Sequence, residues 1–267
     1  MNSNIPEKLI SDDEKSQIEC NLSNPRMEWI LPPILPGDWQ NHTVKEASEL
    51  LAFLGHVVKL GIGNVPLPIA LNLDRVRTRQ LVCYKNAILV EAQGYDPEPG
   101  ILGFIIHGLG ITVLNGSSPP IHELNSELGL KIDSIEAVSD YVLLFLNWVH
   151  SDEGRFQPLI KGSIFEHRLI KPEDKSIVAR HVKEGLGIVH DDSFGAEFVP
   201  HLDGQMRYGA DINILYGNKI FEAKIIMGKE GMLEMVSDNL IAENLETRTE
   251  KLHKAINARS ILAAKGI

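Results

Sequence analysis

The chain has 267 residues, of which 43% are hydrophobic and 23% are charged. This composition is ordinary for a soluble globular protein, and the chain is long enough to bury a hydrophobic core. The net charge of −10 argues against nucleic acid as the main partner, because phosphate contacts favour clustered Lys and Arg.

The cysteine pattern and the charged N-terminus bear on location. Cys20 and Cys83 lie far apart and outside any CxxC motif, so neither a disulfide framework nor a zinc knuckle is indicated. Charged residues between Glu7 and Lys15 stand where a secretory signal would need an apolar run. We therefore expect a cytoplasmic protein without a membrane association.

The N-terminal region combines a polar arm with an apolar strap. Residues 1–26 carry few large apolar groups and are expected to form a flexible arm. The next segment, Met27–Trp39, contains three prolines that forbid a regular helix. We expect an extended strap that lies on the fold and is anchored by Trp29 and Trp39.

A helix and a first set of strands should follow the strap. Thr43 and Glu46 form a capping box, which predicts a helix over residues 44–60. The apolar period then changes from helical to extended, and strands are predicted at 81–84, 87–92, 101–106 and 111–114. Lys85–Asn86 and Gly108–Gly110 are typical of tight turns, so this region indicates an antiparallel meander.

The segment Asp133–Val149 is predicted to be the central helix. Asp133 is the expected N-cap and Glu136 lies in the first turn, where negative charge suits the helix dipole. Nearly every residue that follows is apolar, so the helix must be covered on nearly every side. The run is shorter than the roughly 20 residues that a membrane span requires.

The C-terminal part of the chain repeats a mixture of strands and helices. One or two strands are predicted within Phe156–Leu169, a helix from Pro172 to Gly185, and a long loop over 186–204. Further strands are predicted at 208–215, 219–226 and 232–236, and Gly217–Asn218 is expected to form the turn between the first two. Thr247 and Glu250 form a second capping box before an amphipathic terminal helix.

These elements predict an α+β fold of antiparallel β-meanders packed against helices. The order helix, meander, helix occurs twice, which suggests two similar halves over residues 27–165 and 166–267. Glu91 and Gly100 align without a gap on Glu222 and Gly231. An internal duplication is one interpretation, and chance similarity between two glycine-containing hairpins is the other.

One candidate catalytic group lies in the second meander. Asp211 falls on one predicted strand, and Glu222 and Lys224 lie two residues apart, on one face of the next strand. This group resembles the Asp and Glu-x-Lys pattern of the restriction-endonuclease-like nucleases. The resemblance implies that the two acids hold magnesium and that the lysine helps to activate water for hydrolysis. The alternative is a row of exposed charges on a half-buried sheet.

A second candidate group could ligate a metal. Imidazole and carboxylate side chains suit zinc, manganese or iron, and four of them cluster in the long loop: His190, Asp191, His201 and Asp203. His122 and Glu123 could add distant ligands. No HExxH spacing occurs, and Asp and His are also ordinary residues of surface loops.

The catalytic motifs are incomplete, because no GxSxG or complete GxGxxG motif is present. We therefore expect a non-catalytic protein that binds another protein or a small-molecule ligand, through the strap or the terminal helix, unless these elements only close their own core. The alternative is a metal-dependent nuclease or hydrolase that uses Asp211, Glu222 and Lys224. A divalent metal is expected only under the metal-site alternatives, and the sequence also allows a homo-oligomer.

Overall fold

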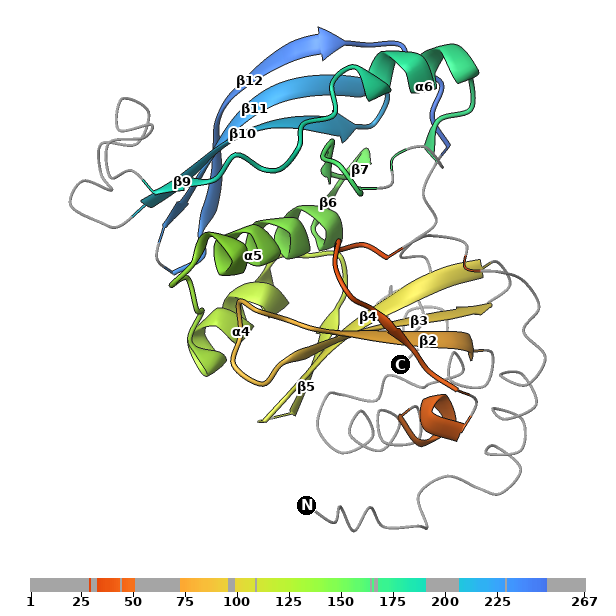
Figure 1. Cartoon of the computed structure of the whole chain (residues 1–267), viewed down its shortest axis with the longest axis vertical. Helices are drawn as coiled ribbons and strands as arrows, with labels where there is room; N and C mark the ends of the chain where they lie inside the picture. The colour runs from red at the N-terminus through yellow and green to blue at the C-terminus, as the bar shows by residue number, and fades with distance from the viewer. Residues whose placement is uncertain are drawn as a thin grey trace, which may run out of the picture.

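The computed structural model describes residues 29, 33–43, 45–50, 73–95, 99–108, 110–163, 165, 168–190, 207–228 and 230–248. Two antiparallel five-stranded sheets lie on opposite sides of a central helix, α5 (Figure 1). The predicted α+β class with antiparallel sheets is confirmed. Residues 1–26 and the terminal helix lie outside the described residues.

Sheet I is formed by the N-terminal half of the chain, and its five strands are in sequence order. They are β1 (Gln40–Asn41), β2 (Leu73–Gln80), β3 (Ile88–Tyr95), β4 (Pro99–His107) and β5 (Gly110–Leu114). The turn after β2 contains Asn86 at φ 57°. Three of the predicted strands correspond to β3, β4 and β5, whereas the strand expected at 81–84 is wrong, because these residues form the turn that follows β2.

Sheet II is formed by the C-terminal half, in the order β12, β11, β10, β8, and β9 also pairs with β10. Its long strands are β10 (Arg207–Tyr216), β11 (Lys219–Gly228) and β12 (Leu233–Ala242), and its short ones are β8 (Gln157–Pro158) and β9 (Val189–His190). The predicted turn at Gly217–Asn218 is present between β10 and β11. β12 continues well past the predicted end at residue 236.

Three helices have both of their ends in the described part of the chain: α4 (Pro119–Leu128), α5 (Ile135–Trp148) and α6 (Pro172–Ala179). α4 was not predicted from the sequence, and a proline occupies its first turn. The N-cap of α5 is Ser134, whose hydroxyl accepts a hydrogen bond from the Ala137 N–H at 3.1 Å. The expected N-cap, Asp133, instead forms an exposed ion pair with Lys131.

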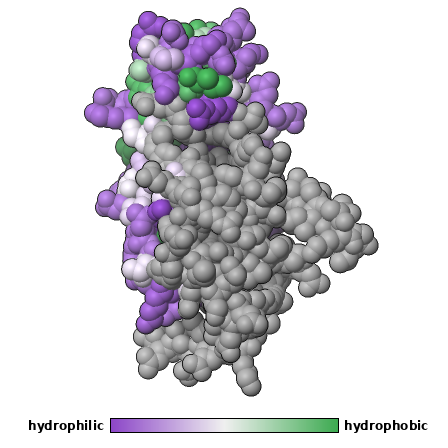
Figure 2. All heavy atoms as spheres, turned by 90° about the vertical axis from the view of Figure 1, so that its right-hand side faces the viewer, coloured by the Kyte–Doolittle hydropathy of each residue, from purple (hydrophilic) through white to green (hydrophobic). Residues whose placement is uncertain are grey.

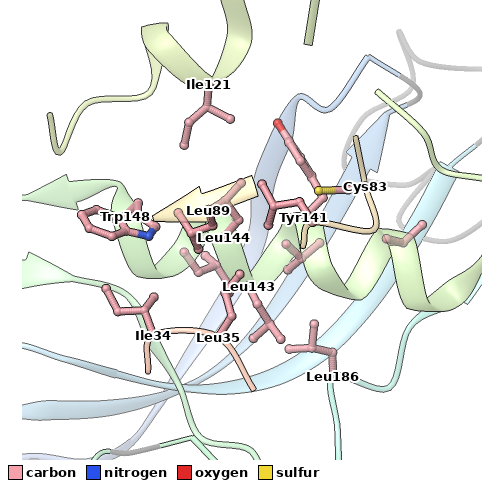
Figure 3. Packing of buried hydrophobic residues seen from close by; sticks show 14 of the residues in the cluster. Ile34, Leu35, Cys83, Leu89, Ile121, Tyr141, Leu143, Leu144, Trp148 and Leu186 are labelled. Carbon is pink, nitrogen blue, oxygen red and sulfur yellow. The ribbon is translucent and has the colours of Figure 1, made fainter. Parts of the chain in front are cut away.

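The main hydrophobic core surrounds α5, as the sequence predicted. Figure 3 shows Tyr141, Leu143, Leu144 and Trp148 of α5 packed with side chains from the strap and from sheet I. The same cluster contains residues of sheet II: Tyr208, Ile212, Ile214, Ala223, Ile225 and Met227. The division at residue 165 remains a prediction, and any two halves would share this core. A smaller cluster lies on the opposite face of sheet II, under α6.

The strap is anchored in the core, in the part that the structure describes. Leu35 is fully buried, and the Ile34 N–H donates to Glu91 Oε1 at 3.1 Å. The expected anchor Trp39 packs against the core and donates from Nε1 to the Leu35 carbonyl at 2.8 Å. This part of the strap therefore packs into the main core. The capping box is confirmed, since Thr43 and Glu46 exchange hydrogen bonds.

The internal duplication is not shown. Glu91 is fully buried on β3, whereas the Glu222 side chain on β11 is 53% exposed. In sheet I, Gly94 pairs with Gly100, but the equivalent Ile225 pairs with Met235 and not with Gly231. The two hairpins therefore have different registers, and the duplication remains a hypothesis based on a short stretch of sequence.

Candidate functional site

The candidate catalytic residues lie together on the outer face of sheet II, which points away from α5. Asp211 on β10 is the direct cross-strand partner of Lys224 on β11, and Glu222 is paired with Asn213. Strand geometry therefore places both carboxylates and the ammonium group on one face. All three residues are exposed to solvent.

A second ammonium group, from Lys183, approaches the same residues. Its Nζ lies 4.0 Å from Glu222 Oε1 and donates to the Asp211 carbonyl oxygen at 3.2 Å. An exposed ion pair of this length contributes little to stability. No group of three or more His, Cys, Asp or Glu residues within the described part of the chain is arranged to hold a metal ion. The role of the three residues remains a prediction.

The second candidate group is mostly outside the described residues. His190 lies on β9, opposite Tyr208, and the centroids of the two rings are 5.1 Å apart. Asp191, His201 and Asp203 are not described. His122 lies on α4 with its ring 5.6 Å from that of Phe145, and Glu123 is the next residue on the same helix.

A buried ionic cluster beneath the strap was missed by the sequence analysis. Arg77 on β2 and Glu91 on β3 are direct cross-strand partners, and both are almost fully buried. Arg77 Nε donates to Glu91 Oε2 at 2.6 Å, and its guanidinium lies 3.9 Å from the centre of the Trp29 ring. The pair thus joins sheet I to the strap.

Burial is the largest influence on the ionisation of this pair. Burial raises the pKa of the Glu91 carboxyl, and the Arg77 guanidinium and the Ile34 N–H offset only part of the rise. Burial likewise lowers the pKa of Arg77, against the attraction of Glu91. Because both shifts disfavour the charged form, each group depends on its partner, which is typical of a structural ion pair.

Sheet I is joined to α5 by a second ion pair from the same face of β2. Arg79 Nη1 lies 2.6 Å from Asp140 Oδ1, and the other oxygen of Asp140 accepts the Val82 N–H at 2.8 Å. Asn147, the polar interruption in the apolar run of α5, accepts from Arg155 at 3.3 Å. The alternation of Arg75, Arg77 and Arg79 was the available signal for this face.

A chain of buried hydrogen bonds connects the two sheets. The Tyr84 hydroxyl donates to Asn125 Oδ1, and Asn125 Nδ2 donates to the Tyr141 hydroxyl at 2.8 Å. Tyr141 in turn donates to the carbonyl of Gly231 at 2.7 Å. Gly231 lies in the turn between β11 and β12, so these hydrogen bonds fix one end of β12 relative to α4 and α5.

β12 is an edge strand of sheet II, and it exposes apolar side chains. The residues of β12 and its preceding turn that expose a large apolar side chain are Met232 (61%), Met235 (40%), Leu240 (52%) and Ile241 (36%). In the described part of the chain, only β11 pairs with β12. Among the described residues, its other edge therefore has unpaired backbone N–H and C=O groups beside these apolar side chains.

The register of β12 determines which way these side chains point. Met235 pairs with Ile225, Asp238 with Ala223 and Leu240 with Phe221. Ile225 and Ala223 belong to the core around α5, so Met235, Asp238 and Leu240 lie on the inner face of the sheet. These side chains of β12 are therefore exposed, although they lie on the same face of the sheet as the buried core residues of β10 and β11. In Figure 2 green apolar atoms appear among purple hydrophilic ones at the top of the molecule, the end that carries α6 in Figure 1.

Comparison with protein-family models, with curated proteins and with solved structures finds no match for this chain. No helix in the described part of the chain has the length and apolar character needed to cross a membrane.

Proposed function

We propose that this protein is a non-catalytic binding protein that docks an extended segment of another protein along β12. The supporting observation is that, among the described strands, only β11 pairs with this ten-residue strand, whose other edge lies beside exposed apolar side chains. A peptide that adds a strand to a sheet edge gains main-chain hydrogen bonds, and its alternate side chains contact the apolar surface. A cytoplasmic location remains a prediction from the sequence.

Rigid support of β12 favours this assignment. The turn before β12 is held by the hydrogen bonds of Gly231, and Leu233 packs against the core around α5. After β12, Leu245 is buried and its N–H donates to the Asn218 carbonyl at 3.1 Å. An edge fixed at both ends loses little conformational entropy when a partner binds.

The test uses two fluorescein-labelled ten-residue peptides in which valine and threonine alternate around a central Lys or a central Glu. Binding is measured by fluorescence anisotropy. Replacing Met235 and Leu240 together by Ser should weaken binding about tenfold, because two apolar contacts are lost. The control variant Ile170→Ser removes a side chain that is 45% exposed elsewhere. The proposed function is wrong if neither peptide binds, or if the control weakens binding equally.

The second candidate function is metal-dependent hydrolysis at Asp211, Glu222 and Lys224. It is favoured by the register that pairs Asp211 with Lys224 and sets Glu222 on the same face. A metal that binds only the folded chain should raise the melting temperature. Magnesium or manganese should then raise it for the native chain and not for Glu222→Ala, whereas the control Glu234→Ala on β12 should keep the rise.

The loop metal site has a separate test, because its ligands differ. Zinc or manganese should raise the melting temperature, and His201→Ala should abolish this rise. If the intact chain hydrolyses DNA or RNA in the presence of manganese, the proposed binding function is wrong and the protein is a nuclease. The absence of any ion-dependent shift would count against both metal sites.

A further inference from the structure

We infer that Asp238 makes the β12 edge selective for a strand that carries a basic residue between apolar ones, and prevents β12 from pairing with a second copy of itself. This inference rests on the proposed function, since it specifies the segment that β12 would bind.

The surroundings of Asp238 give the first argument. Its side chain lies on the inner face, opposite Ala223, and its neighbours along that face of β12 are Met235 and Leu240. Within the described residues Asp238 has no ion-pair partner, and it is exposed. A strand docked beside β12 would bring apolar side chains to Met235 and Leu240 and a third side chain to Asp238. A lysine or arginine there completes a cross-strand charge pair, whereas an acid is repelled.

The irregular register of β12 gives the second argument, which concerns a second copy of the chain. Register shifts interrupt the β11 pairing between Lys224 and Ile225 and between Ile220 and Phe221, which leaves Val236 and Ile241 as extra residues on β12. The regular stretch between these bulges is short and contains Asp238. Antiparallel self-pairing centred on Asp238 keeps the inner faces of both copies on the same side of the sheet and sets Asp238 against its own copy.

Bulges and an inward-facing charge are devices by which edge strands avoid pairing with one another. They do not exclude a cationic partner, because a basic side chain compensates Asp238 and a flexible peptide follows a bulged edge. Exposed apolar side chains on an edge that is protected from self-pairing therefore fit a separate partner better than a homodimer. The partner that matches is an extended segment with alternating apolar residues and a central Lys or Arg.

The decisive variant is Asp238→Asn, which keeps the shape of the side chain and removes its charge. The native chain should bind the Lys peptide about tenfold more tightly than the Glu peptide, because attraction to one and repulsion of the other add. Asp238→Asn should reduce this ratio to near one. The control Glu234→Gln removes an acid from the outer face of β12 and should leave most of the preference intact.

The preference should also decrease as salt increases from 0.05 M to 0.5 M, because exposed charges are screened. Equal binding of both peptides by the native chain would overturn the selectivity of Asp238 while leaving the proposed function intact. Retention of the full preference by Asp238→Asn would overturn it as well.

Light scattering tests the second half of the inference. The native chain should not dimerise through β12, and Asp238→Asn should increase any self-association compared with Glu234→Gln. A native dimer that Met235→Ser and Leu240→Ser dissociate would show that a second copy occupies the edge. If peptides bind only after residues 249–267 are removed, the occupant is the chain's own terminal segment, and the separate partner is refuted.

Discussion

Replacing Gly231 by Ala should measure how strongly the buried hydrogen-bond chain holds the two sheets together. Gly231 has a φ of +79°, and a Cβ atom there would lie 2.5 Å from Asn125 Nδ2 and 2.6 Å from the Tyr141 hydroxyl. Contacts this short require both groups to move. The variant therefore disturbs the hydrogen bond from Asn125 to Tyr141 and the one from Tyr141 to the Gly231 carbonyl.

The expected loss of stability has two parts. An L-residue in the left-handed conformation costs about 1–2 kcal/mol compared with glycine. Disruption of two buried hydrogen bonds adds about 1 kcal/mol each, so Gly231→Ala should lose roughly 3–4 kcal/mol. Gly129 provides the control, because its φ is +70° and nothing lies within 4 Å of its Cβ position. Gly129→Ala should therefore show only the backbone cost.

The assay is urea unfolding followed by far-ultraviolet circular dichroism, with the two variants compared at the same protein concentration. Tyr141→Phe removes the shared hydroxyl, and its effect should not add to that of Gly231→Ala. Equal losses for Gly231→Ala and Gly129→Ala would refute the reasoning, because the hydrogen-bond chain would then contribute nothing measurable.

Three further predictions concern the core. Leu144→Ala should lower the free energy of unfolding by about 2–5 kcal/mol. The loss should exceed that of Phe145→Ala, because Leu144 is fully buried and Phe145 only partly. Comparing the urea unfolding midpoints of the two variants tests this order. Arg77→Met and Glu91→Gln should each lower the free energy of unfolding by about 3–5 kcal/mol, since each single change leaves a buried charge unpaired. The double variant should lose less than the sum of the two. Losses of unfolding free energy that add up would contradict this. Cys83 should resist iodoacetamide at pH 8 until urea unfolds the chain, because burial raises the pKa of its thiol; peptide mass mapping would detect early labelling.

The elements that could be predicted are those whose local sequence and tertiary surroundings agree. The apolar run of α5 has no stable location except a core, and the tight turn at Gly217–Asn218 sets the register that pairs Asp211 with Lys224. β2 was missed because Arg77 and Arg79 point inward, against the usual alternation, and Glu91 and Asp140 stabilise that orientation. Such partners are distant in sequence.

The β12 edge was missed for a different physical reason. Two bulges break the alternation of apolar and polar residues along Leu233–Ala242, so the period-two pattern ends near residue 236. The start of α4 was hidden by Pro119 and Pro120, which suit a turn as well as the first turn of a helix. The charges of the candidate catalytic group could be placed on one face, but the sequence does not indicate Lys183 beside them.

The position of α5 between the two sheets constrains the order in which the chain can fold during synthesis. Sheet I and α5 leave the ribosome before the strands that cover the other side of α5, namely β10 and β11. Until residues up to 228 have emerged, one apolar side of this helix has no partner and can aggregate or recruit a chaperone. Contacts between segments so distant in sequence also slow folding. Interrupted synthesis should therefore yield insoluble fragments, even when all of sheet I is complete.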